Sequence, residues 1–214
     1  MSEASSVGII GGADGPTAIF VTSSAGPEWF FLGLLIGLNI LALWKRKKRI
    51  YAYAAAVFDI LALDAWTKLW TVTHLALGES TKFLPGLVSL THVHNYGAAW
   101  SSFSGERWLL IIATSIGMAA IVYLLVCVVR HPLGVWSLLA VLGGGLGNLW
   151  NRVAFGFVVD MFDLDFMNYP VFNVADIFVV CGAIAAAIYY WALYEKYDAK
   201  NWEKKDGNED ADAK

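Results

Sequence analysis

Residues 107–129 read RWLLIIATSIGMAAIVYLLVCVV, an apolar run whose single charge, Arg107, stands at its first position. A helix of about 20 residues crosses the hydrocarbon core of a bilayer, so this run is long enough to span a membrane. Further apolar runs cover residues 29–44, 50–74, 134–150 and 171–194, of which the first is short for a span. The sequence therefore predicts an all-α polytopic membrane protein, with a four-helix transmembrane core and an added N-terminal hydrophobic helix.

The composition of the chain agrees with a membrane protein. Apolar residues make up 58% of the 214 residues, charged residues only 15%, and the mean hydropathy is +0.57. The charges gather at residues 45–49 and after Glu195, with no basic surface typical of nucleic-acid binding. We expect three parts: an N-terminal extension (1–49), a four-span domain (50–194) and a charged cytoplasmic tail (195–214).

Positive charges predict how the spans are oriented, because loops rich in lysine and arginine stay in the cytoplasm. Such residues lie at 45–49, at 130–131 and after residue 195, which places all three groups on the cytoplasmic side. The segments at 75–106 and 150–170 are then expected to face outward.

Residues 83–95, FLPGLVSLTHVHN, alternate and break like short strands around a turn. They predict a small extracytoplasmic β segment. His92 and His94 lie in it, two residues apart, but no third ligand accompanies them, so we expect no metal site.

Two aspartates are the candidate catalytic groups. Ionisable side chains near or within a span need a partner or a function. Asp160 and Asp176 are both predicted at the outward end of spans, where they can meet. Two close carboxyls cannot both ionise, so one keeps its proton while the other can accept a proton from water. The alternative is structural: each aspartate caps a helix or pairs with Arg152.

Five short motifs follow one another along the chain. They are LDAWTK (63–68), NYGAAW (95–100), GGGLGNLWNR (143–152), GFVVD (156–160) and FNVAD (172–176). In order and spacing they resemble the motifs of the lipoprotein signal peptidase (signal peptidase II) family, across roughly residues 50–194.

The resemblance implies an intramembrane aspartic endopeptidase with Asp160 and Asp176 as its catalytic dyad. Its substrate would be a diacylglyceryl-modified prolipoprotein, cut immediately before the lipidated cysteine with water and without a metal or other cofactor. The implied setting is the bacterial cytoplasmic membrane, with the active site near the outer face, membrane lipid around it and a monomeric enzyme.

Supporting roles follow from the same resemblance. Asn95 and Asn173 are expected to hold the substrate backbone, and Asn148 and Arg152 to order the outer end of the site. Asp64 matches the aspartate of the family's D-x-x-T-K motif, but it also has an i,i+4 partner in Lys68, which offers a plain helix-surface explanation. Asn151 departs from the pattern, because the family usually has aspartate before the arginine.

The N-terminus carries a different signal. Residues 8–20, GIIGGADGPTAIF, resemble a loop of the β subunit of sodium-translocating decarboxylases, which would implicate Asp14 in a sodium path. A short fusion to the peptidase-like part is the simpler account. Two rival functions therefore stay open: a sodium-transport-associated subunit and a non-catalytic membrane subunit.

Overall fold

The computed structural model describes residues 7–10, 18–21, 49–97, 103 and 105–199. The chain divides into two compact units, residues 1–52 and 53–214. In the first unit, β1 (Val7–Ile10) pairs antiparallel with β2 (Ala18–Val21). The predicted helix at 29–44, Asp14 and the end of the charged tail lie outside the described residues, so those expectations stay predictions.

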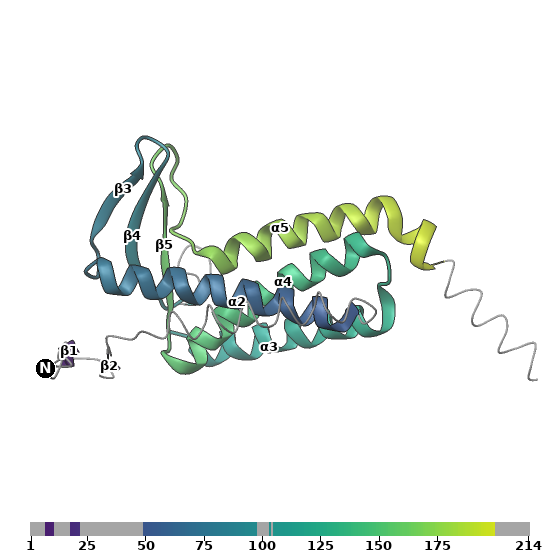
Figure 1. Cartoon of the computed structure of the whole chain (residues 1–214), viewed down its shortest axis with the longest axis horizontal. Helices are drawn as coiled ribbons and strands as arrows, with labels where there is room; N and C mark the ends of the chain where they lie inside the picture. The colour runs from purple at the N-terminus through teal and green to yellow at the C-terminus, as the bar shows by residue number, and fades with distance from the viewer. Residues whose placement is uncertain (1–6, 11–17, 22–48, 98–102, 104, 200–214) are drawn as a thin grey trace, which may run out of the picture. The chain divides into compact units, whose positions relative to one another are not determined.

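Four helices of the described residues are long and apolar enough to cross a membrane, which confirms the predicted multi-span core. They are α2 (Arg49–His74), α3 (Arg107–Tyr123, continued by η2, Leu124–Val128), α4 (Pro132–Ala154) and α5 (Val174–Tyr189, continued by η3, Tyr190–Ala199). Figure 1 shows these helices running side by side.

Helix α4 is the centre of this bundle. More than half of its most apolar stretch, 56%, is buried, against 6% for α3. Glycines permit the close approach: a Cβ at Gly144 would meet the carbonyl oxygen of Ala175 on α5, and one at Gly143 would lie 3.0 Å from the side chain of Ile60 on α2. The middle of α4 therefore faces both neighbouring helices.

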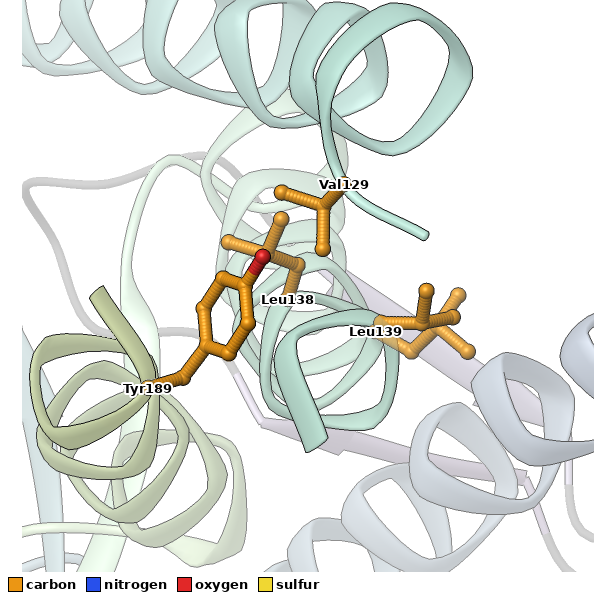
Figure 2. Packing of buried hydrophobic residues seen from close by; sticks show 5 residues of the cluster. Val129, Leu138, Leu139 and Tyr189 are labelled. Atoms are coloured by element: carbon orange, nitrogen blue, oxygen red, sulfur yellow. The ribbon is translucent and has the colours of Figure 1, made fainter. Parts of the chain in front are cut away.

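Apolar side chains pack around the N-terminal end of α4. Val129, Leu138, Leu139 and Tyr189 belong to one buried cluster where the chain enters α4 and where α5 ends (Figure 2). The side chain of His131 caps α4 by accepting a hydrogen bond from the backbone nitrogen of Leu133.

An antiparallel three-stranded sheet stands at the opposite end of the bundle, in the order β3 (Ser80–Leu84), β4 (Val88–Asn95) and β5 (Val158–Leu164) (Figure 1). The first two strands confirm the predicted β segment. Strand β5 was not predicted.

The expectation that Asp160 ends a span is therefore wrong. Helix α4 stops before Gly156, whose φ of 86° suits glycine, and Asp160 then lies inside β5 opposite Val93. Residues 158–161 are all buried, and backbone groups in such a run need partners, which β4 supplies.

Candidate active site

Side chains from five elements converge where the sheet meets the outer end of the bundle. They are Asp64 and Lys68 on α2, Asn95 on β4, Asn148 and Arg152 on α4, Asp160 on β5, and Asn173 and Asp176 at the start of α5.

Helix α5 begins with a reciprocal cap that fixes Asp176. Oδ1 of Asn173 accepts a hydrogen bond of 3.0 Å from the backbone nitrogen of Asp176. In return, Oδ2 of Asp176 accepts one of 3.1 Å from the backbone nitrogen of Asn173. This capping box satisfies donors of the first turn and holds the half-buried carboxyl at the positive end of the helix.

Asp160 is held by two amides. Its Oδ1 accepts a hydrogen bond of 2.6 Å from Nδ2 of Asn173, and its Oδ2 accepts one of 2.9 Å from Nδ2 of Asn95. Only 1% of its surface is exposed. Burial raises the pKa of Asp160 to about 6, and the charge of Asp176 makes a smaller contribution in the same direction. The hydrogen bonds from the two asparagine side chains and the charge of Lys68 lower this pKa.

Asn148 completes the set of donors to the two carboxyls. Its Nδ2 donates a hydrogen bond of 2.7 Å to Oδ1 of Asp176. All four carboxylate oxygens of Asp160 and Asp176 thus accept a hydrogen bond from an asparagine. The arrangement orients both groups and leaves Asp176 the more accessible of the two.

The pair on α2 is buried, so its interpretation as a helix-surface pair is wrong. Nζ of Lys68 lies 2.8 Å from Oδ2 of Asp64, and both side chains are at most 5% exposed. The ammonium also donates to Oδ1 of Asn148 at 2.9 Å, while Oδ1 of Asp64 accepts from the backbone nitrogen of Ala175 at 3.0 Å. The pair thereby ties α2 to α4 and α5.

Arg152 lies beside the site, and among the described residues it forms no ion pair with Asp160 or Asp176. The alternative that these aspartates serve to pair with Arg152 is therefore wrong. Its Nη2 donates to the carbonyl oxygen of Gly97 at 2.9 Å, two residues past Asn95. The capping alternative holds for Asp176. Asn151 is buried with its side-chain oxygen unpartnered.

No group of three or more histidine, cysteine or acidic side chains suited to a metal occurs in the described part of the chain. The ring of His92 bonds to the carbonyl oxygen of Leu75 at 2.9 Å. His94 stacks on Phe157, and burial, with a smaller effect of His92, lowers the pKa of His94 to about 4.

Sequence reasoning missed the backbone groups of the site, the nitrogen of Ala175 and the carbonyl of Gly97. Backbone groups leave no residue-type signal. It also missed Gly147, where a Cβ would lie 2.7 Å from Oδ2 of Asp64. The glycines at 143–147 are visible in the sequence, but the sequence does not show which side chain needs the space.

Comparison with known proteins places this geometry in a family. The sequence profile described as signal peptidase (SPase) II matches residues 56–192. The chain belongs to the signal peptidase II family. Its spans and sheet are therefore those of a membrane peptidase.

Two curated relatives support the assignment. A lipoprotein signal peptidase of Streptococcus pyogenes serotype M2 is 38% identical over 149 residues, which cover 68% of this chain and 95% of the relative. A lipoprotein signal peptidase of Enterococcus faecalis is 44% identical over 133 residues, covering 61% of this chain and 81% of the relative.

Solved structures agree with the fold. A bacterial membrane enzyme determined by the in meso method at 2.3 Å resolution superposes with a TM-score of 0.63 at 28% sequence identity, covering 65% of this chain and 87% of the enzyme. A second such structure, at 1.9 Å resolution, superposes with a TM-score of 0.62, and the match covers 94% of that enzyme.

Proposed function

We propose that this signal peptidase II family member removes the signal peptide from diacylglyceryl-modified prolipoproteins, with Asp160 and Asp176 as its catalytic dyad. One observation carries the proposal: Asn173 donates hydrogen bonds to both carboxyls, so a single residue holds the two groups together at the outer end of the bundle. A pair of neighbouring carboxyls of which one is ionised and the other protonated is suited to peptide hydrolysis by activated water.

The reaction needs one ionised and one protonated carboxyl. The ionised carboxylate takes a proton from water, and the oxygen attacks the carbonyl carbon that precedes the lipidated cysteine. The protonated carboxyl donates its proton to the carbonyl oxygen. When the tetrahedral intermediate collapses, the C–N bond breaks, and the carboxyl that took the proton from water gives it to the cysteine nitrogen, which leaves as an amine. The other carboxylate takes back a proton from a hydroxyl of the intermediate, so both carboxyls return to their starting states.

The asparagines have an orienting role in this mechanism. Asn95 and Asn173 were expected to hold the substrate backbone, but their amide groups already donate to Asp160. We assign them first to fixing that carboxyl. Arg152, through the carbonyl of Gly97, orders the chain that follows Asn95 and so the rim of the site.

The membrane setting follows from the charges. Among the described residues, Arg49 at the start of α2, Arg130 before α4 and Lys196 in η3 lie at the ends of the spans opposite the sheet. These charges support an orientation with the dyad at the outer face of the bacterial cytoplasmic membrane. The substrate then enters sideways from lipid. Both carboxyls and all their donors come from one chain, so residues 50–194 are proposed to act as a monomer, with 1–49 as an extension.

The test is cleavage of a purified diacylglyceryl-prolipoprotein by the full chain in detergent or lipid bilayers. Asp160→Asn and Asp176→Asn are each expected to reduce cleavage to background. Asp163→Asn is the matched control, because it makes the same change on β5 at a residue that contacts Thr91 instead of the dyad. Folded wild type without activity would refute the proposal and favour a non-catalytic subunit. Active Asp160→Asn or Asp176→Asn variants would instead refute the assignment of these two residues as the catalytic dyad.

A further inference from the structure

Lys68 has two acceptors inside the bundle. Its ammonium donates to Oδ2 of Asp64 at 2.8 Å and to Oδ1 of Asn148 at 2.9 Å, and 4% of the residue is exposed. The first contact explains why a cation can be buried here. The second contact connects Lys68 to the candidate active site, because Asn148 is the residue that contacts Asp176.

The ammonium fixes which way the Asn148 amide points. An ammonium donates only, so it requires the amide oxygen and not the amide nitrogen. Nδ2 of Asn173 is a second donor to the same oxygen, at 3.1 Å. With the oxygen so held, Nδ2 of Asn148 must face Oδ1 of Asp176, where it donates at 2.7 Å. If the amide were reversed, its nitrogen would face the donors of Lys68 and Asn173, and its oxygen would face the carboxylate of Asp176.

This chain of hydrogen bonds reaches Asp176 and so makes the two carboxyls of the dyad inequivalent. We propose that Lys68 is a positioning residue that acts through Asn148 to keep Asp176 as the ionised, water-activating carboxylate, which leaves Asp160 as the proton donor. The inference rests on the proposed function and assigns the two steps of that reaction: water gives its proton to Asp176, and Asp160 gives its proton to the carbonyl oxygen.

The environments of the two carboxyls agree with this division. Asp160 is 1% exposed in the sheet, and burial raises its pKa to about 6. Asp176 is half-buried at a helix N-terminus, where negative charge is favoured. The charged groups that interact with Asp176 are Asp64 and Lys68 on α2, Arg152 on α4 and Asp160 on β5.

The experiment is the pH profile of kcat/KM for prolipoprotein cleavage by the full chain with Lys68→Met and Lys68→Arg. The acid limb reports the group that must be ionised in the free enzyme. We expect Lys68→Met to lower kcat at least about tenfold and to move the acid limb to higher pH by about one unit, with KM little changed. Lys68→Arg retains the charge and the donors, so this variant is expected to keep most of the wild-type pH profile.

Two further variants separate positioning from folding. Lys82→Met makes the same substitution at an exposed lysine of β3 and should leave the profile unchanged. Because Lys68→Met leaves Asp64 buried without its partner, the double variant Asp64→Asn, Lys68→Met removes both charges and should fold yet show the same shifted limb.

The outcomes are distinct. A folded Lys68→Met or double variant with lower kcat but an unshifted acid limb would make Lys68 merely structural and overturn the inference. A shift from Lys68→Met that is as large in an Asn148→Leu background as in the wild-type chain would also overturn it, because the effect would then bypass Asn148. Absence of cleavage by the wild-type protein would instead refute the proposed function.

Discussion

Asn173 donates a hydrogen bond of 2.6 Å from its side chain to Asp160, across the junction between the sheet and helix α5. The same side chain caps α5 by accepting from the backbone nitrogen of Asp176. One amide therefore sets the position of the helix that carries one carboxyl and the orientation of the other. Loss of this residue should affect stability and chemistry together.

Asn173→Ala is expected to lower the free energy of unfolding by about 1 kcal/mol or more through loss of the cap. It should also reduce cleavage much more than that destabilisation explains, because Asp160 loses a donor. Thermal unfolding in detergent and kcat measured well below the midpoint separate the two effects. Asn168→Ala, at an exposed position between β5 and α5, is the control and should change neither.

Asn95→Ala should move the pH dependence of cleavage. The hydrogen bond from Asn95 lowers the pKa of Asp160 against the stronger effect of burial, so its removal raises that pKa from its value of about 6. If the protonated form of Asp160 is the active one, the alkaline limb of kcat/KM moves to higher pH, although the maximal rate falls. The limbs belong to the coupled pair, so their direction of movement is the measurement. A limb that moves to lower pH would contradict the assignment of Asp160 as the donor.

Gly144→Ala should separate α4 from α5. The added Cβ would meet the carbonyl oxygen of Ala175, and backbone cannot yield as a flexible side chain does. We expect a loss of about 1–3 kcal/mol of stability, together with reduced activity because Ala175 precedes Asp176. Gly117→Ala on α3 is the matched change in open space and should be tolerated. Equal melting temperatures for the two variants would show that the contact is not tight.

Asp198→Ala should weaken the end of the bundle opposite the sheet without altering the dyad. The carboxylate accepts hydrogen bonds from Tyr189 Oη and from the backbone nitrogens of Arg130 and His131. Its removal leaves these donors without their acceptor, at a cost of about 1–3 kcal/mol. Thermal unfolding should show the loss, and KM and the pH profile should stay at wild-type values below the melting temperature. A shifted pH profile would show coupling between the two ends.

The spans were predictable because hydropathy is a local property of the chain. The run at 107–129 is too apolar and too long to be read otherwise, and α3 with η2 occupies nearly the same residues. The start of α5 was predicted three residues early, because hydropathy does not mark the cap at Asn173. Strand β5 was missed because residues 156–162 are apolar except for Asp160, and periodicity alone does not separate so short a segment from a helix end.

The sequence by itself determined the membrane class, the number of core spans and the identity of the polar residues, because apolar length and motif order are properties of consecutive residues. Only the tertiary structure decided how those residues act on one another. Lys68 and Asn148 are 80 positions apart, and no local pattern predicts that an ammonium on α2 orients an amide on α4. That contact depends on glycines that let the two helices approach, so the asymmetry proposed for Asp160 and Asp176 arises from packing and not from either motif alone.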